Sequence, residues 1–220
     1  MKKNHNTPIP IVSKAILSSV NVGMLYSFML KRIAKGYSTS EVSFLMGYTN
    51  DYMKQKEELI SIGFSFEDMH CFRHAVEEKS LSGVISNFEH LKTMGSYQLI
   101  KDSDPIKTSL KMIRYEEDGT ETQIFHLIET NMANSNLKTA ELENEAEVTA
   151  MLNVLFEGRM FYTPQSPLQI YQKCRNTLSD NVAPRHLQTA LKTLTKKKDF
   201  PKLKRIKSKD NGCMYEKVFE

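Results

Sequence analysis

The chain has 220 residues, of which 40% are hydrophobic and 25% charged, so it is long enough for one or two globular domains and is neither disordered nor fibrous. No run approaches the roughly 18 apolar residues of a membrane span, and Met1 to Pro10 lacks a secretory signal pattern, which favours a cytoplasmic protein with no membrane partner. The net charge of +4 hides an asymmetry: residues 159–220 carry 14 Lys or Arg against 5 Asp or Glu, or +9, and residues 1–158 carry the remaining −5. A basic C-terminal third is typical of a surface for a polyanion such as nucleic acid, the alternative being a solvated lysine-rich tail.

The first part of the sequence has the spacing of helices. Between residues 21 and 78 apolar residues recur at intervals of three and four, and glycines stand where helices would end. The spacing predicts helices at 22–33, 38–46, 49–60 and 65–76, and a fifth at 81–94. Ser38 and Ser65 are the predicted N-caps, with Glu41 and Asp68 three residues further on.

The middle of the sequence has strand character. Residues 106–115 and 122–128 are β-prone and flank Asp118-Gly119, a strong hairpin signal. Residues 131–138 contain three Asn and few apolar side chains, which predicts a linker.

Helical spacing returns after the linker. It predicts helices at 142–156, 166–178 and 184–197, the last two with a proline at the favoured first position. Two short strands, 203–206 and 214–219, bracket a turn at 208–212. Three helices followed by a hairpin is the layout of a winged helix.

These elements predict a mostly α chain with small β additions. We expect an N-terminal five-helix helix-turn-helix domain that is extended by a β-hairpin, and a C-terminal winged helix. The expected boundaries are 1–100 for the helix-turn-helix domain, 101–130 for the β-hairpin extension, 131–140 for the linker and 141–220 for the winged-helix domain.

The helix-turn-helix prediction has a local physical basis. Gly36 ends the first predicted helix, and Gly47 permits a tight turn between the second and the third. Val42 and Leu45 therefore face Met53 across that turn. Over residues 21–76 the sequence resembles the Xre family of phage repressors (Cro/C1 type). The resemblance includes Arg32 and Glu57, at positions where that family often carries a buried structural Arg–Glu pair.

This resemblance implies a DNA-reading surface. Thr39 would contact a phosphate, and Asn50, Asp51 and Gln55 would enter the major groove, where Asn and Gln suit adenine and Asp suits cytosine. Lys54 would lie on the same outer face of the recognition helix. The alternative is a helical bundle that keeps the fold and uses it for protein contacts.

Residues 140–220 resemble winged-helix domains in general. The resemblance implies that the third helix presents side chains to bases, with Arg185 suited to guanine and Gln188 to adenine, and that the hairpin clasps phosphates. The implied helix residues are Arg185, His186, Gln188, Thr189 and Lys192, and the implied hairpin residues are Lys202, Lys204, Arg205, Lys207 and Lys209. Two alternatives are an edge strand kept soluble by lysines and masking of the basic surface by the acidic run Glu141, Glu143, Glu145 and Glu147.

The sequence shows no cluster that indicates catalysis or metal binding. Three cysteines that are odd in number and far apart predict reduced thiols. His70 and His74 are four residues apart, as helical metal ligands would be, but no third and fourth ligand accompany them, so we expect no metal and no other cofactor. No nucleophile beside a base, carboxylate pair or glycine-rich phosphate loop appears, and we do not expect an enzyme.

The leading prediction is therefore sequence-specific binding of double-stranded DNA by a nucleoid-associated bacterial transcription regulator. Palindromic operators call for two-fold proteins, so the β-hairpin and the fifth helix are candidate contacts of a homodimer. Two alternatives stay open: a DNA-binding replication initiator, and an adaptor that binds a protein partner in a mobile-element or phage-related assembly.

Overall fold

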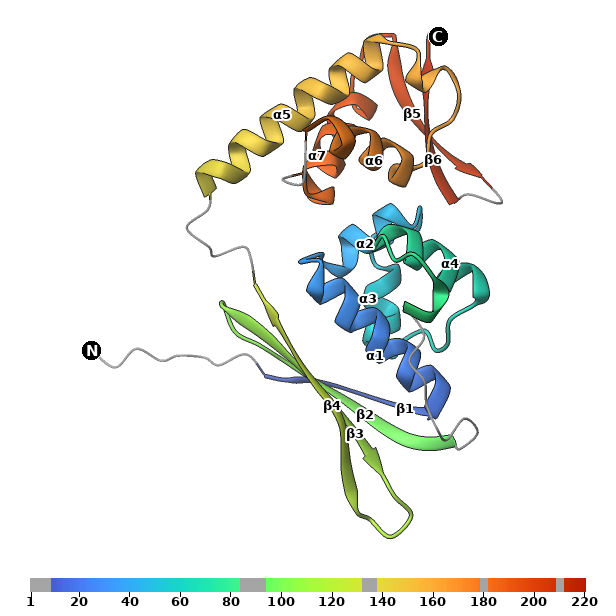
Figure 1. Cartoon of the computed structure of the whole chain (residues 1–220), viewed down its shortest axis with the longest axis vertical. Coiled ribbons are helices and arrows are strands. Elements are labelled where there is room, and N and C mark those ends of the chain that lie inside the picture. Colours follow the sequence, from blue (N-terminus) through green and yellow to red (C-terminus); the bar gives the residue numbers. More distant parts are fainter. Residues whose placement is uncertain (1–8, 84–93, 132–137, 179–181, 209–211) are drawn as a thin grey trace, which may run out of the picture.

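A computed structural model describes residues 9–83, 94–131, 138–178, 182–208 and 212–220 of the chain. These residues form three parts that follow one another along the molecule (Figure 1). A four-stranded sheet lies at one end, four short helices lie in the middle, and a unit of three helices and a hairpin lies at the other end.

The sheet corrects the predicted fold class, because an N-terminal five-helix domain with an added hairpin is wrong. Four antiparallel strands pair in the order β1-β2-β3-β4. Their bounds are β1 Ile11–Ser18, β2 Met94–Ser103, β3 Lys107–Tyr115 and β4 Glu121–Thr130. The β3–β4 hairpin is where the Asp-Gly turn placed it, but it forms half of a sheet. Two of the four strands were missed because β1 and β2 pair across more than 70 residues of sequence, and no local turn signal joins them.

Both ends of the range predicted for a fifth helix, 81–94, have other structure. Leu81–Gly83 form a single 3₁₀ turn, and Met94 belongs to β2. Residues 84–93 and the predicted linker residues 132–137 lie outside the described residues.

The four middle helices are α1 Ser19–Ala34, α2 Thr39–Leu45, α3 Tyr52–Glu57 and α4 Phe66–Ala75. Ser38 and Ser65 cap α2 and α4 in full capping boxes with Glu41 and Asp68. Helix α1 packs on one face of the sheet, where Leu25 and Met29 join the inward-facing side chains Leu99 and Met112 in one apolar cluster. The sheet is therefore a platform for the helices.

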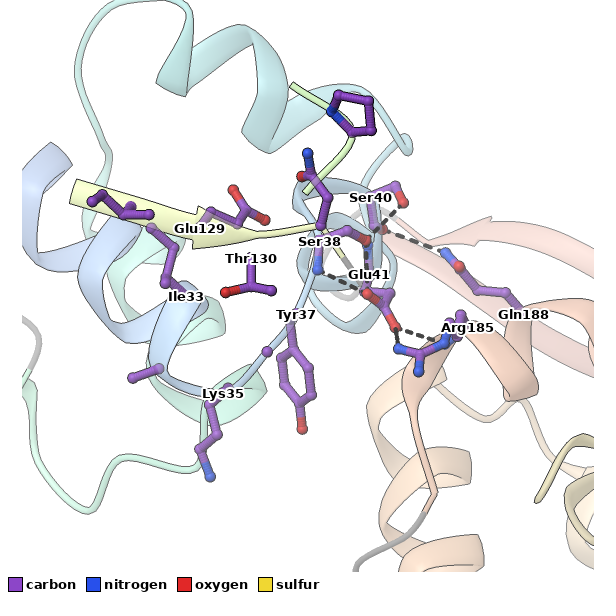
Figure 2. A pocket seen from close by; sticks show the side chains of 15 residues that line it. Ile33, Lys35, Tyr37, Ser38, Ser40, Glu41, Glu129, Thr130, Arg185 and Gln188 are labelled. Atoms are coloured by element: carbon purple, nitrogen blue, oxygen red, sulfur yellow. Dashed lines mark hydrogen bonds and ion pairs between the residues drawn. The ribbon is translucent and has the colours of Figure 1, made fainter. Parts of the chain in front are cut away.

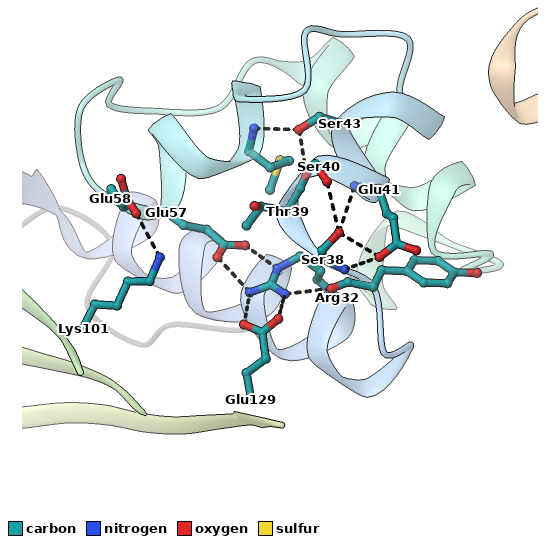
Figure 3. Close-up of polar contacts among 12 residues, drawn as sticks. Arg32, Ser38, Thr39, Ser40, Glu41, Ser43, Glu57, Glu58, Lys101 and Glu129 are labelled. Carbon is teal, nitrogen blue, oxygen red and sulfur yellow. Dashed lines mark hydrogen bonds and ion pairs between the residues drawn. The ribbon is translucent and has the colours of Figure 1, made fainter. Parts of the chain in front are cut away.

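A buried guanidinium joins α1, α3 and the sheet (Figure 3). Arg32 is fully buried and donates to both carboxylate oxygens of Glu57, at 2.7 and 2.9 Å, and to both of Glu129 on β4, at the same two distances. Its fifth N–H group donates to the Tyr37 carbonyl oxygen at 2.8 Å. Burial alone would lower the pKa of Arg32, but the two carboxylates raise it above its ordinary value. All five donors of this side chain thus have acceptors.

The C-terminal unit consists of α5 Lys138–Glu157, α6 Pro167–Leu178, α7 Pro184–Thr195, β5 Lys202–Ser208 and β6 Gly212–Val218. A 3₁₀ turn, Met160–Tyr162, follows α5. Gln165, between α5 and α6, exchanges backbone hydrogen bonds with Tyr215 on β6 and adds a short third strand to the hairpin. The order of elements is helix, short strand, helix, helix, hairpin.

The C-terminal unit shares a hydrophobic core with the middle helices. Val42 and Phe72 belong to the same buried cluster as Ile170 and Leu187. The hydroxyl groups of Tyr37 and Tyr171 lie 3.0 Å apart, within hydrogen-bonding distance. The two helical parts are therefore packed as one body rather than held only by a linker.

Glu77 adds an ionic contact to this shared core. It follows α4 and pairs with Lys35 at the end of α1, at 2.8 Å, and with Arg175 on α6. Burial alone would raise the pKa of Glu77, but the hydrogen bonds from Lys35 and Arg175 outweigh burial and lower it below its ordinary value. The charged form of Glu77 thus stabilises the packing of α6 on the middle helices.

Replacing Arg32 by methionine tests the buried cluster. Arg32→Met leaves the Glu57 carboxylate buried without its counter-charge, so we expect the free energy of unfolding to fall by about 3 to 5 kcal/mol. Urea denaturation measures it, with Lys31→Met as the matched control, since Lys31 makes only a half-exposed ion pair with Glu78 and should cost less than about 1 kcal/mol. Equal losses in the two variants would contradict the central role of Arg32.

The pH dependence of stability tests Glu77. A carboxyl group whose pKa is lowered by folding stabilises the protein above its unfolded pKa of about 4.5, and this contribution is lost as the pH falls through the folded pKa. Between about pH 5 and pH 3, wild type should therefore lose stability more steeply than Glu77→Gln, which cannot titrate. Parallel curves from denaturation at a series of pH values would show that Glu77 is not charged more readily in the folded state.

Candidate nucleic-acid interface

The turn between α2 and α3 is fixed by a serine. Ser43 is fully buried; its hydroxyl donates to the Thr39 carbonyl oxygen at 2.7 Å and accepts the Met53 backbone N–H at 2.9 Å. Gly47 supplies the positive φ of 78° that the turn requires. The connection between α2 and α3 is thus held by the Ser43 hydroxyl and by the backbone conformation of Gly47.

This geometry exposes the start of α3 and the residues before it. Asn50, Asp51 and Lys54 are exposed, and Gln55 is half-buried. The Gln55 side chain donates to Asp51 at 2.5 Å, and hydrogen bonds from Thr49 and then Gln55 lower the pKa of the Asp51 carboxyl. Two of the predicted base-reading residues are therefore paired with each other.

Thr39, the predicted phosphate contact, is the first residue of α2 and is half-buried. Its carbonyl oxygen accepts the Ser43 hydroxyl, which itself accepts the Met53 backbone N–H of α3.

The N-terminal end of helix α7 contacts α2 (Figure 2). The Arg185 backbone N–H and guanidinium approach the buried Glu41 carboxylate at 3.1 and 3.4 Å, and the Gln188 amide approaches the Ser40 carbonyl oxygen at 3.4 Å. Two predicted base-reading residues of α7 thus contact α2.

His186 was predicted to face DNA, and the structure corrects this. It is only 5% exposed, and its Nδ1 accepts the Ala183 backbone N–H at 3.4 Å, near the start of α7. The amphipathic pattern of α7 identified the face that packs inside its own unit, but it carried no signal for the second contact with α2. The exposed predicted residues of α7 are Thr189 and Lys192, which lie further along the helix.

The basic residues of β5 divide between two faces, because side chains alternate along a strand. Lys204 lies opposite Glu216, whereas Arg205 and Lys207 lie on the other face, opposite Tyr215 and Cys213. All three basic side chains are exposed. Lys209 lies outside the described residues.

The hairpin touches the turn between α2 and α3. The Cys213 backbone N–H donates to the Gly47 carbonyl oxygen at 2.7 Å, and the Arg205 Nε–H lies 2.6 Å from the Cys213 sulfur. Because Lys207 pairs with Cys213, the basic end of β5 lies beside the residues that lead into α3. We call the exposed side chains here the α3–wing surface. It consists of Asn50, Lys54, Arg205 and Lys207.

The two histidines of α4 lie close to each other and to Arg73. The rings of His70 and His74 are 4.6 Å apart, and Arg73 lies 2.6 Å from the His74 Nε2. Burial, and then the charges of Arg73 and His70, lower the pKa of His74. Among the described residues, no group of three or more His, Cys, Asp or Glu side chains is arranged to hold a metal ion.

None of the described helices has the length and apolar character that crossing a bilayer requires.

Two residues of this region were missed from the sequence. Glu41 was predicted only as a capping partner of Ser38, yet it also accepts from Arg185 on α7, and Glu129 of β4 was not expected beside Arg32. The capping signal is local, whereas both added contacts span more than 90 residues. No periodicity or spacing points to such pairs.

The chain matches no family model, no curated protein and no solved structure. Its function has to be inferred from the arrangement of its own residues.

Gly212→Ala tests the contact between the hairpin and the α2–α3 turn. Gly212 has a φ of 64°, and a Cβ atom there would lie 2.5 Å from the Gly47 carbonyl oxygen. The control is Gly119→Ala, where φ is 84° but nothing lies within 4 Å of the added atom. Both variants carry a backbone cost of about 1 to 2 kcal/mol, and Gly212→Ala should lose about 1 to 3 kcal/mol more from the collision.

Amide exchange locates the effect of Gly212→Ala. The Cys213 N–H should exchange faster in that variant and at the wild-type rate in Gly119→Ala. A Cys213 amide that keeps its protection in Gly212→Ala would contradict the observed packing of the hairpin.

Proposed function

We propose that the protein binds double-stranded DNA through the α3–wing surface and acts as a sequence-reading regulator, with transcription as the process it most simply serves. The observation that carries the proposal is the contact of Cys213 with Gly47, which holds the basic end of β5 beside the exposed start of α3. One surface then combines side chains for bases with side chains for phosphates.

The two halves of this surface have complementary tasks. Arg205 and Lys207 supply the positive charge that phosphates need, and Asn50 at the start of α3 has the amide that pairs with adenine in the major groove. Lys54 adds a second cation on the helix itself. Phosphate contacts would set the register and orientation of the protein, and α3 would read sequence.

Helix α7 has a supporting role in this proposal. Its Arg185 and Gln188 face α2, so they belong to the contact between the C-terminal unit and the middle helices. The exposed Lys192 still contributes to the positive field of the C-terminal unit.

A charge-reversal pair tests the proposal in the full-length protein. Lys54→Glu/Lys207→Glu removes one cation from each half of the α3–wing surface, and Lys14→Glu/Lys111→Glu makes the same charge change on the sheet. Fluorescence anisotropy with random duplex DNA should show at least about tenfold weaker binding for the first pair, and a salt dependence whose slope is smaller by about 2.

The control pair should bind within about threefold of wild type. Equal weakening by both pairs would mean that only net charge matters and would overturn the assigned surface. No binding by the wild-type protein at low salt would overturn DNA binding and favour the protein-adaptor alternative.

A further inference from the structure

Two aromatic side chains are exposed together at one end of the C-terminal unit. Tyr162, in the 3₁₀ turn after α5, is 53% exposed, and Phe219, directly after β6, is 56% exposed. The centroids of their rings lie 5.7 Å apart, and the ring planes meet at 82°. We call Tyr162 and Phe219 the aromatic pair. Burial of aromatic rings is favourable, so two neighbouring rings that face water indicate a surface for a partner.

The aromatic pair lies away from the α3–wing surface. Phe219 directly follows Val218, which pairs with Lys202 at the start of β5. Lys207 of the α3–wing surface lies toward the other end of the hairpin, about 16 Å further along β5 at about 3.3 Å per residue. The chain ends beside Phe219, at the point marked C in Figure 1. A molecule bound to the aromatic pair would therefore leave the α3–wing surface free.

A buried lysine lies beneath the aromatic pair. Lys217 is only 7% exposed, and its ammonium group donates to the Phe156 carbonyl oxygen at 2.7 Å. The same nitrogen lies 5.9 Å from the Tyr162 ring centroid and 5.6 Å from that of Phe219. A cation at this distance from an aromatic ring is attracted to it, so Lys217 helps to position both rings and adds a positive charge beneath them.

A second cation, Lys197, lies beside this group. It follows α7 and is exposed, and its ammonium nitrogen lies 5.6 Å from the centroid of the Phe156 ring. The Lys217 nitrogen approaches the same ring, at 4.4 Å. Phe156 thus connects an exposed lysine with the buried one that contacts the aromatic pair.

The stretch between α7 and β5 continues this combination of charge and aromatic surface. Residues 196–202 carry four lysines against one acid, Asp199. Phe200 is 46% exposed, and the Lys202 nitrogen lies 4.5 Å from its ring centroid. Exposed rings and positive charge therefore occur together at this end of the unit.

This combination suits a single strand of nucleic acid better than a duplex. The bases of a duplex stack on one another, whereas those of a single strand can stack on exposed aromatic rings. Cations beside the rings contact the phosphates of the same strand. An apolar segment of a protein partner would cover the rings but would leave the lysines without an opposite charge.

We propose that this end of the C-terminal unit binds a single strand of nucleic acid. Bases stack on Tyr162 and Phe219, and phosphates contact Lys197 and Lys202. The chain then has two nucleic-acid surfaces, one for duplex DNA and one for a strand whose bases are unpaired. The second surface does not depend on the first.

Fluorescence anisotropy of the full-length protein with labelled oligothymidylate of about 12 nucleotides tests this surface. Leucine keeps apolar packing but has no ring face, so Tyr162→Leu and Phe219→Leu should each weaken binding by about fivefold or more, the loss expected for one stacked base. Phe66→Leu is the matched control, since Phe66 is 67% exposed at the start of α4, and it should bind within about twofold of wild type. Duplex DNA should bind all three variants as it binds wild type.

Crosslinking locates the bound strand. An oligonucleotide that carries 5-iodouracil forms a covalent bond on irradiation with an aromatic side chain on which that base stacks, and mass spectrometry should find the bond on Tyr162 or Phe219. Oligouridylate of the same length distinguishes RNA from DNA, and tighter binding of either strand supports the site.

Three results would overturn the site: no binding of either oligonucleotide at low salt, equal affinities in Tyr162→Leu and Phe66→Leu, or crosslinks confined to residues 49–58. The last result would place the strand on the α3–wing surface. Circular dichroism of each leucine variant shows whether it keeps the fold. Because single strands and duplex DNA are titrated separately, failure of one surface is distinguishable from failure of the other.

Discussion

The Arg32 guanidinium is the interaction that joins α1 and α3 to the sheet and on which the position of α3 depends. A buried cation is costly unless all of its donors are satisfied, and here five acceptors come from α3, β4 and the connection after α1. The same group therefore fixes the angle of α3 and ties the helices to the sheet. Lys101 on β2 adds a second link, an ion pair of 2.9 Å with Glu58 at the end of α3 (Figure 3). With α3 held in this way, the turn before it becomes a fixed docking point for the C-terminal hairpin.

That docking changes which residues are available for recognition. A separate winged helix would present the start of its third helix, but here Arg185 and Gln188 face α2 and His186 is buried. The exposed cations of β5 are instead placed beside α3 by the contact of Cys213 with Gly47. The shared core beneath these contacts makes the arrangement a property of the whole chain. We therefore propose that one surface, the α3–wing surface, binds DNA, in place of two separate modules.

The parts of the fold that could be predicted are those with local signals. The Ser38 and Ser65 capping boxes, the glycine turn before α3 and the Asp-Gly hairpin each depend on a few neighbouring residues, and each is present. Strand β1 could not be predicted as part of a sheet, because β2, its partner among the described strands, lies more than 70 residues away. The same limit applies to the site. Helical spacing identified the exposed face of α3, but it could not show that Glu41 accepts a hydrogen bond from α7 or that Glu129 accepts one from Arg32.

The most direct test of the composite surface is hydrogen exchange of the full-length protein with and without duplex DNA, followed by mass spectrometry of its peptides. We expect slower exchange in peptides that cover residues 49–58 and 202–208 when DNA is bound, and unchanged exchange in residues 107–115 on the sheet. Protection confined to the sheet, or to α7 without α3, would contradict it.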